Sequence, residues 1–444
     1  MYKAILSLIV ILGLSGCASY RTVAVQPKPI PLTKEFPDVQ PDLTRSKKYL
    51  DKADFSLSDA LSLALIRNPQ LAVFSYETRI REAEALQASL LPNPEFDAEV
   101  ENFAGSGTLN NFQGSELTFS VGQLIELGGK RQKRAQVAAL SADLAAWDYE
   151  AVKLDVFVDV VSLFTNALAV QQQMDLRQEL VNVAESFLKN IQRRVEAGRD
   201  SPAEAARAKV ELSAAKIDLQ RLQKELQSAR KKLAATWGSD EPTFGRLRGN
   251  LDVVTELPAL EKLDALVSNN PDIARWTTEI QQRDAELSLE KTQRIPDPLI
   301  GAGYRRLNQS GDNAFIMGIS LPLQIFNRNQ GNIQAAQYRK SQAEQMKRAV
   351  QISLSSALTE IYNNLSASYH EISTLKTSVI PEAQNAYEMI KQGYQMGKYG
   401  FLDVLAAQRS LFEVRSQYLN ALADYHQNTA RLERLIGQKL SDVQ

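Results

Sequence analysis

The stretch VEAGRD at residues 195–200 recurs about 200 residues later as QMGKY at residues 395–399, with Gly198 and Gly397 in register. Other short motifs recur at nearly the same spacing, so two copies of one structural unit are fused in this chain. We predict a first repeat at residues 56–238, a linker at 239–257, a second repeat at 258–437 and a tail at 438–444. The supporting pairs are Asn68-Pro69 with Asn270-Pro271, PNP at 92–94 with PDP at 296–298, and Trp237-Gly238 with Ile436-Gly437.

The N-terminus has the features of a lipoprotein signal peptide. A basic residue precedes an apolar run at residues 4–14 that is too short to span a bilayer. The sequence LSGC then matches the site where bacterial lipoproteins are cleaved and acylated, so we predict removal of residues 1–16 and lipidation of Cys17, the only cysteine. The residues after Cys17 are not acidic, which favours the outer membrane; a secretory signal with a chance cysteine is the alternative. The proline-rich residues 17–55 are predicted to form an extended tether.

Each repeat contains two short stretches in which apolar and polar residues alternate. Residues 95–103 and 115–124 show this period of two in the first repeat, and residues 299–306 and 314–321 occupy the same place in the second. A length of about nine residues crosses a bilayer when the strand is tilted. A soluble hairpin with one wet face would show the same alternation, but a lone hairpin between long helices has little of its own to pack on.

Very long helices follow the strands of each repeat. Residues 131–197 contain neither glycine nor proline, and the return segment after Gly198 has apolar residues at alternating spacings of four and three, which is a heptad seam. The second repeat has the same pair at residues 332–396 and 401–436. Pro381 interrupts its long helix, and because a proline removes a donor and clashes with the preceding turn, we expect a bend or hinge there.

Four strands cannot close a barrel, so several chains must pool their strands. An open sheet edge cannot face lipid, because its backbone N–H and C=O groups would be unpaired. The predicted fold class is therefore mainly α with a small transmembrane β part, in a duplicated helix-strand-strand-helix-helix unit. The side chains predicted to face lipid are Phe96, Val100, Phe119, Phe315 and Ile319, and those predicted to line the barrel lumen are Asp97, Glu99, Glu101 and Glu116.

The charges and the reactive side chains exclude several classes of function. The 51 basic and 52 acidic residues nearly balance, so no nucleic acid partner is expected. The sequence has no glycine-rich phosphate loop, no nucleophile motif and no cluster of His or Cys, and its two histidines, His370 and His426, lack a second ligand at helical spacing. We therefore expect no enzyme activity, no cofactor and no bound metal. A lipid-anchored periplasmic coiled-coil scaffold is the structural alternative to a transport duct.

Two further stretches resemble a known family. EVENFAGSG at residues 99–107 and QLIELGGKR at residues 123–131, together with the repeated motifs, resemble TolC-type outer-membrane efflux proteins, and within them the CzcC-like, heavy-metal branch. The resemblance covers essentially all of the mature chain. It implies a homotrimer whose twelve-stranded barrel in the outer membrane continues into a twelve-helix periplasmic tunnel. It further implies a passive exit duct that works with a periplasmic adaptor (membrane fusion) protein and an inner-membrane RND pump.

The resemblance also suggests the cargo, which would be divalent heavy-metal cations such as cobalt, zinc or cadmium. Export of drugs or other small molecules is the alternative, because selectivity resides in the pump. In the family the two helical turns form a tip that docks the adaptor and opens like an iris, although glycines also serve simply to permit a tight turn. The tip positions are Gly198, Arg199, Asp200, Ser201, Gly397, Lys398, Tyr399 and Gly400.

Charged residues near the turns and near the strands suggest two further roles. Three copies each of Glu204 and Asp403 would crowd acidic groups into an aperture that selects cations, although helix capping is the alternative for Glu204. The basic residues at 130–134 would either contact phospholipid headgroups or form a solvated charge run.

Overall fold

The computed structural model describes residues 53–268 and 270–443, which divide into two compact units. The predicted signal peptide, Cys17 and nearly all of the predicted tether lie outside the described residues. Each unit takes segments from both repeats, so the repeats are not separate domains. We call the units the strand unit, with residues 78–146 and 278–340, and the helical unit, with the described residues among 53–77, 147–277 and 341–443.

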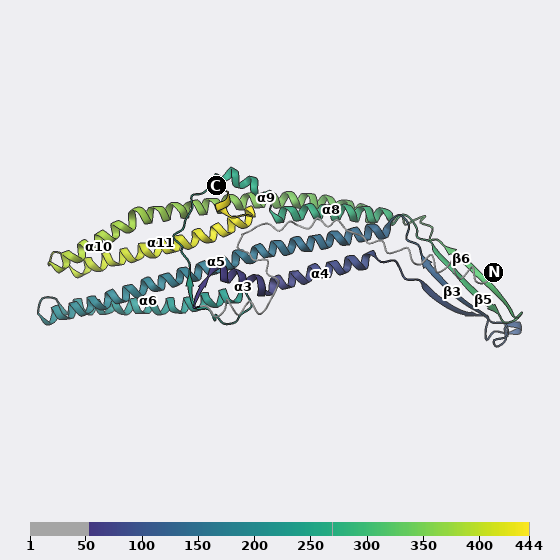
Figure 1. The fold of residues 1–444 in the computed structure, drawn as a ribbon, viewed down its shortest axis with the longest axis horizontal. Helices are drawn as coiled ribbons and strands as arrows, with labels where there is room; N and C mark the ends of the chain where they lie inside the picture. Colours follow the sequence, from purple (N-terminus) through teal and green to yellow (C-terminus); the bar gives the residue numbers. More distant parts are fainter. Residues whose placement is uncertain (1–52, 269, 444) are drawn as a thin grey trace. The chain divides into compact units, whose positions relative to one another are not determined.

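The strand unit contains one antiparallel sheet with the strands β2 (Glu95–Glu101), β3 (Glu116–Leu124), β5 (Leu299–Leu307) and β6 (Asp312–Ser320) (Figure 1). These strands overlap the four stretches that alternate in the sequence. Strand β3 of the first repeat pairs with β5 of the second, so the two predicted hairpins join in the order β2-β3-β5-β6. The outer edges of β2 and β6 have no strand partner within the described chain.

The register of the sheet sorts the side chains by polarity. Phe119 lies opposite Ala98 on one side and Tyr304 on the other, and Tyr304 lies opposite Phe315, so one face is apolar across all four strands. Phe315 and Met317 on this face are each 83% exposed in the single chain. The opposite face carries all four acidic residues predicted to line a lumen, namely Asp97, Glu99, Glu101 and Glu116.

Four long helices keep the lateral order of the strands, namely α4 (Pro69–Ser89), α5 (Lys130–Glu196), α8 (Pro271–Thr292) and α9 (Gln330–Thr374). Within the strand unit, Arg134 of α5 donates to a backbone carbonyl of α4 at 3.0 Å. Gln282 of α8 donates to Ser141 of α5 at 2.5 Å, and Lys340 of α9 pairs with Asp284 of α8 at 2.6 Å. The order α4-α5-α8-α9 therefore matches β2-β3-β5-β6.

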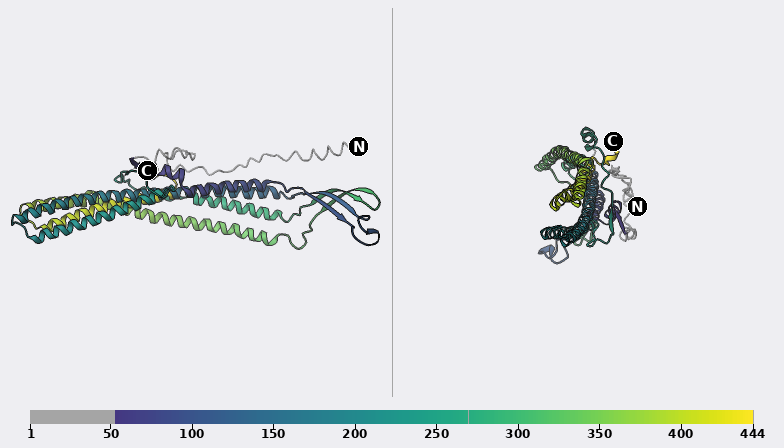
Figure 2. Two further views of the ribbon diagram at one scale, coloured as in Figure 1. Left: turned by 90° about the horizontal axis from the view of Figure 1, so that it is seen from below. Right: turned by 90° about the vertical axis from the view of Figure 1, so that its left-hand side faces the viewer.

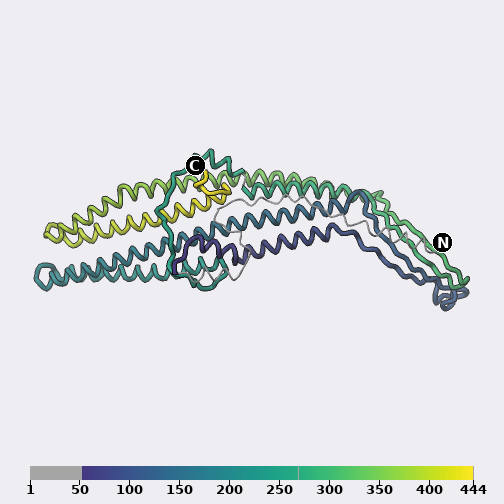
Figure 3. Tube along the Cα trace, viewed as in Figure 1, coloured from purple at the N-terminus to yellow at the C-terminus, as the bar shows by residue number. Residues whose placement is uncertain are grey.

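The helical unit holds two antiparallel hairpins whose turns lie at the same end (Figure 1, Figure 2 and Figure 3). The first pairs α5 with α6 (Pro202–Ala235), and the second pairs α10 (Ile380–Gln395) with α11 (Phe401–Ile436). One 18-residue window of α5 is apolar enough to cross a membrane, but 67% of that window is buried inside the protein. The heptad seam predicted for α6 packs inward, with Ala208, Ala215, Leu219, Leu222, Ala229 and Leu233 buried.

The helix that contains Pro381 continues through a widened turn. A π-helical turn, Leu375–Val379, joins α9 to α10, and the N–H of Ile380 donates to the Leu375 carbonyl five residues earlier. A wider turn relieves the contact that a proline ring makes with the carbonyl four residues before it, and it absorbs the missing donor. The predicted irregularity therefore takes the form of a π-helical turn within a continuous helical path.

The segment between the repeats, predicted as the inter-repeat linker, contributes a strand and an aromatic residue to the core. Within it, β4 (Arg246–Arg248) pairs in parallel with β1 (Asp54–Ser56). The Phe55 side chain is fully buried and stacks on Phe244 with ring centroids 4.5 Å apart. Burial of this aromatic pair draws both segments into the core, so the tether ends before residue 54 rather than at 55. Two short helices, α3 (Leu57–Arg67) and α7 (Leu260–Val267), follow β1 and β4 in the chain.

An asparagine that precedes a proline ties each repeat together in the same way. Asn68 accepts a hydrogen bond from the first turn of α4 at 2.9 Å and donates to the Thr236 carbonyl at the end of α6 at 2.7 Å. Asn270 accepts one from the first turn of α8 at 2.8 Å and donates to the Leu435 carbonyl of α11 at 2.8 Å. Each asparagine side chain thus pairs a free backbone N–H at the start of one helix and a free backbone carbonyl at the end of another. The repeated Asn-Pro motif is one tertiary contact present twice.

We expect Asn270→Ala to destabilise the chain by about 2–3 kcal/mol, because it removes a helix cap and leaves a buried carbonyl at the end of α11 unpaired. Chemical unfolding followed by circular dichroism measures this loss. The control is Asn166→Ala, at an exposed side chain on α5, which should change stability by less than about 0.5 kcal/mol. Equal stability of the two variants would contradict the role of Asn270.

Candidate functional site

The two hairpin turns share one backbone geometry. At each turn the long helix ends in a Schellman motif, in which the N–H of Arg199 or of Lys398 donates to the carbonyl five residues earlier at 2.8 Å. Gly198 and Gly397 precede these donors with φ of +70° and +77°, a conformation in which a side chain would be strained. The register of the two glycines in the sequence is therefore explained by the turn geometry.

One polar cluster, which we call the latch, joins the first hairpin to the second beside these turns. Asp200 accepts two hydrogen bonds from the guanidinium of Arg194, at 2.7 and 2.9 Å, and one from the hydroxyl of Tyr394 at 3.1 Å. The Arg194 guanidinium also lies over the Tyr394 ring, 5.0 Å from its centroid. The Asp200 side chain is only 5% exposed, so its charge depends on these partners. Arg194 and Asp200 flank the first turn, and Tyr394 comes from the second hairpin.

Sequence reasoning identified Asp200 but missed Arg194 and Tyr394. The latch pairs side chains from different repeats, and a local sequence pattern does not predict a contact between residues so far apart in the chain. The register of the repeats offers one signal, because Tyr394 lies as far before Gly397 as Val195 lies before Gly198, yet it is polar where Val195 is not.

The latch holds its ionisation over a wide range of pH. The hydrogen bonds from Arg194 are the main reason that the pKa of Asp200 lies below its usual 3.8. Burial, followed by the charge of Asp200, raises the pKa of Tyr394 to about 12 from an ordinary value of 10.0. The stabilisation from Asp200 is therefore lost as pH falls from its usual pKa of 3.8 through the lowered one, and the stabilisation from Tyr394 is lost as pH rises from 10.0 toward about 12.

An apolar cluster packs beside the latch. Tyr394 and Phe401 approach with ring centroids 6.3 Å apart, and both belong to a buried group that includes Ile191 and Val404. The predicted tip residue Tyr399 lies against Gly393, where a Cβ would come within 2.3 Å of its ring. Gly393 therefore makes room for Tyr399.

The two acidic residues predicted to form an aperture have different environments. Asp403 is exposed and accepts the N–H of Gly400 at 2.9 Å, so it caps α11. Glu204 is half-buried, and its carboxylate has no hydrogen-bond partner among the described residues. Its charge adds to the stronger effect of Asp200 in raising the pKa of Arg194. From the sequence, helix capping is the alternative role for Glu204 at the first turn. The structure instead shows a capping contact of this kind from Asp403 at the second turn.

A groove of about 380 Å³ lies between the first hairpin and α11. Phe187 of α5, Ala215 of α6 and Phe401 of α11 give it an apolar lining, while Arg409 donates to Glu211 across it. The groove combines an apolar floor with charged rims, which is a surface suited to an amphipathic helix.

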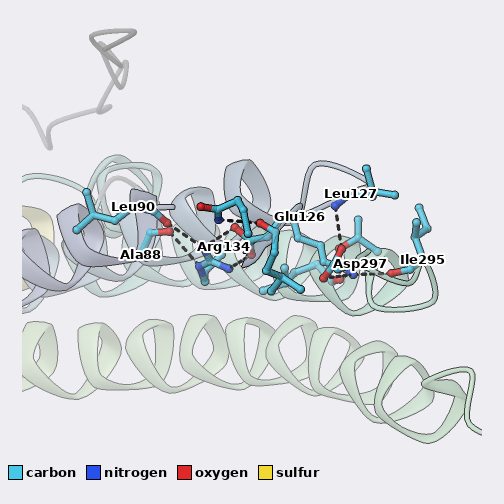
Figure 4. A network of polar contacts seen from close by, with 12 residues as sticks. Ala88, Leu90, Glu126, Leu127, Arg134, Ile295 and Asp297 are labelled. Carbon is cyan, nitrogen blue, oxygen red and sulfur yellow. Dashed lines mark hydrogen bonds and ion pairs between the residues drawn. The ribbon is translucent and has the colours of Figure 1, made fainter. Parts of the chain in front are cut away.

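A second polar network lies in the strand unit, where β3 passes into α5 (Figure 4). Glu126 accepts two hydrogen bonds from Arg134, at 2.5 and 3.1 Å, and Arg134 also donates to two backbone carbonyls beside the end of α4. Lys130 is buried and pairs with Asp297 at 2.7 Å. The two predicted alternatives for residues 130–134, lipid contact or a solvated run, are therefore wrong for Lys130, which is buried, while Arg134 stays partly exposed and is paired within the protein.

Neither histidine belongs to a metal-binding cluster among residues 53–268 and 270–443, where no group of three or more His, Cys, Asp or Glu is placed to hold a metal ion. His426 is half-buried with Nε2 2.8 Å from the Leu251 carbonyl, and its partial burial lowers its pKa. His370 packs edge-on against Tyr369.

Comparison with known proteins gives consistent matches over both repeats. A family model described as outer membrane efflux protein matches residues 60–239 and 263–438. The cobalt-zinc-cadmium resistance protein CzcC of Cupriavidus metallidurans is 34% identical over 383 residues, covering 86% of this chain and 90% of that protein. The nickel-cobalt-cadmium resistance protein NccC of Alcaligenes xylosoxydans xylosoxydans is 24% identical over 284 residues, or 64% of each chain. The solved structure of CusC aligns with a TM-score of 0.73 and 18% identity, covering 93% of this chain and 98% of that one, and so shares its fold.

We expect Asp200→Asn to speed amide exchange at both turns by roughly 10- to 150-fold, since loss of a charged hydrogen-bond pair is worth about 1.5–3 kcal/mol. Hydrogen–deuterium exchange of peptides covering residues 193–201 and 392–400 measures this effect. Asp240→Asn, at an exposed carboxylate outside the latch, is the control and should leave exchange unchanged.

The shifted pKa values of Asp200 and Tyr394 also predict how amide exchange at the turns depends on pH. After correction for intrinsic rates, exchange at the wild-type turns should be constant from about pH 5 to pH 9, because neither Asp200 nor Tyr394 titrates there. A loss of protection between these limits would show that another group controls the turns.

Proposed function

The chain belongs to the outer membrane efflux protein family, and from this membership we propose that it is the passive outer-membrane exit duct of a tripartite RND-type system that exports divalent heavy-metal cations such as cobalt, zinc or cadmium. The observation that carries the metal assignment is the similarity to the cobalt-zinc-cadmium resistance protein along most of both chains. Three of our structural findings support the duct: an incomplete sheet with one apolar face, long helical hairpins, and a latch at their turns.

We propose that three copies close the sheet into a twelve-stranded barrel and continue it as a twelve-helix periplasmic tunnel. The support is physical, because the free edges of β2 and β6 expose backbone groups that lipid cannot satisfy. The helices that continue these edges also have apolar side chains without cover in the single chain. Within the strand unit they include Ile80 on α4 and Tyr338 on α9.

In this barrel the apolar face of the sheet meets lipid and the acidic face lines the lumen. Arg305 on the acidic face bridges Glu101 and Glu116, at 3.3 and 2.9 Å, and so compensates part of the charge. Asp97 and Glu99 have no such partner among the described residues, which leaves the lumen with a surplus of negative charge that favours cations. The lipid on Cys17 would add a second membrane anchor.

In the helical unit, the turns and the groove beside them would dock the periplasmic adaptor, which links the duct to the inner-membrane pump. The latch then holds the second hairpin against the first until the adaptor engages. Glu204 and Asp403 would border the aperture that opens there. The energy for transport comes from the pump, and the duct itself needs no cofactor.

The assignment of the two sheet faces is tested by a pair of neighbours on β6. Met317→Arg places a charge on the apolar face and should cost about 2–4 kcal/mol if the site lies near the bilayer centre. Ile316→Arg places the same charge on the acidic face and should be tolerated. The measurement is the yield of heat-resistant trimer on unheated gels, with unfolding in lipid vesicles as confirmation. Equal loss in both variants would remove the support for a lipid-facing and a lumen-facing side.

The cargo is tested by the metal tolerance of cells that lack this chain. We expect growth to fail at several-fold lower cobalt, zinc or cadmium, with unchanged tolerance to drugs and dyes. The wild-type gene should restore tolerance, and Asp240→Asn should restore it equally. Gly397→Pro, which removes the donor and the positive φ of the second turn, should not. Sensitivity to drugs alone would retain the duct and overturn the metal assignment.

A further inference from the structure

Exposed apolar side chains continue along the chain beyond the end of β6. Phe315, Met317 and Ile319 project from the apolar face of the sheet, and beyond Ser320, where the strand ends, Leu321, Leu323 and Ile325 are also exposed. Leu323 is 76% exposed, and Phe326, which follows the run, is 89% exposed. An apolar band bounded by an aromatic residue is typical of a barrel surface that passes from the hydrocarbon to the headgroup region.

Two arginines lie where this band ends. A hollow of about 460 Å³ is lined by Arg294, which follows α8, and by Arg328, which precedes α9, together with Ile325 and Phe326. Both arginines are exposed, and neither guanidinium has a hydrogen-bond or ion-pair partner among the described residues. Gln330, Ile333, Gln334 and Gln337 of α9 complete the lining.

The equivalent place in the first repeat is organised differently. There the connection from β3 to α5 is short, and Lys130 and Arg134 are neutralised by Asp297 and Glu126 (Figure 4). In the second repeat the nearby carboxylate of Glu290 is already engaged by the side chain of Asn329 at 2.5 Å. The two arginines are therefore left without an internal acid, beside an exposed apolar surface.

We propose that this hollow binds the phosphate of a glycerophospholipid in the periplasmic leaflet of the outer membrane, with a preference for an anionic headgroup. Guanidinium groups match phosphate oxygens in charge and geometry, and the glutamine amides can donate to the headgroup. Ile325 and Phe326 would contact the first methylenes of the acyl chains. This inference rests on the proposed function, because it requires the apolar face to lie in a membrane.

A second copy of the chain is a weaker explanation of the same surface. Copies would meet along the edges of β2 and β6, whereas Phe315, Met317 and Ile319 project from the apolar face, and the exposed apolar residues at 321–326 follow them directly in the chain. Contact with another copy would also bury two cations that need acidic partners. A phospholipid would supply both missing partners, because its phosphate pairs with the two arginines and its acyl chains cover the apolar surface.

The first test compares lipid binding by the full-length, lipidated protein in detergent. Arg294→Gln combined with Arg328→Gln should weaken retention of phosphatidylglycerol about tenfold, as counted by native mass spectrometry. Arg339→Gln combined with Arg348→Gln removes the same charge from exposed positions farther along α9 and should bind as the wild type does. Phosphatidylcholine should bind more weakly to the wild type, and inorganic phosphate at equal concentration should not displace the lipid.

Three results would overturn the inference: equal loss in both double variants, full displacement by inorganic phosphate, or dissociation of the oligomer by the first double variant with lipid retention per chain unchanged. The third would assign the surface to contact between copies.

The second test locates the surface in the membrane. The added fluorescence of the Phe326→Trp variant should be quenched at least twofold by phospholipids brominated near the carbonyl end of the acyl chains, relative to wild-type protein with its three native tryptophans. Tyr399→Trp at the helical turn is the control, and its added fluorescence should not be quenched. If the Phe326→Trp variant reconstitutes and conducts ions but its added fluorescence is unquenched, only this inference fails. If it neither inserts nor conducts, the proposed function fails as well.

Discussion

The free edges of β2 and β6 set the central constraint on this protein. Within the described chain each edge presents a row of backbone donors and acceptors with no strand partner, and in hydrocarbon every such group is costly. The four helices keep the order of the strands, so α4 and α9 lie on the same two sides as β2 and β6. Their exposed apolar side chains therefore extend the requirement for neighbours from the sheet into the helices. Under the proposed function, closure of the barrel and closure of the tunnel are one event.

The contacts that the two repeats share build the scaffold of the fold. The features that differ between the repeats are the latch, the strand–helix junctions and the π-helical turn. The Asn68 and Asn270 contacts and the two Schellman turns are nearly identical in both repeats. The latch breaks this equivalence, because its acid and its guanidinium come from the first repeat and its hydroxyl from the second. The junctions between strands and helices differ as well, with paired cations in one and unpaired cations in the other. The π-helical turn before Pro381 also belongs to the second repeat alone.

The elements of this fold could be predicted from the sequence because their signals are local. A period of two, a heptad spacing and a glycine in register each depend on residues close together in the chain. The contacts that decide charge are not local. Arg134 is satisfied by Glu126 and by carbonyls of α4, and Tyr394 meets an acid from the other repeat, so neither pairing follows from composition. Phe55 was assigned to the tether for the same reason, since its burial depends on Phe244 from the segment between the repeats.

The electrostatics of the latch limit how the turns can be opened. Arg194 lowers the pKa of Asp200 below its usual value, and the pKa of Tyr394 is raised to about 12, so a change of protonation cannot release the contact at ordinary periplasmic pH. A ligand shifts such an equilibrium only by the difference in its affinity for the two states. A partner that opens the turns must therefore bind the open arrangement more tightly, by at least the free energy that the latch contributes. Three equivalent copies would multiply that requirement, which favours a partner that engages all three tips together. Under the proposed function, a duct with this latch would stay closed until its adaptor is assembled on it, whatever cargo is present.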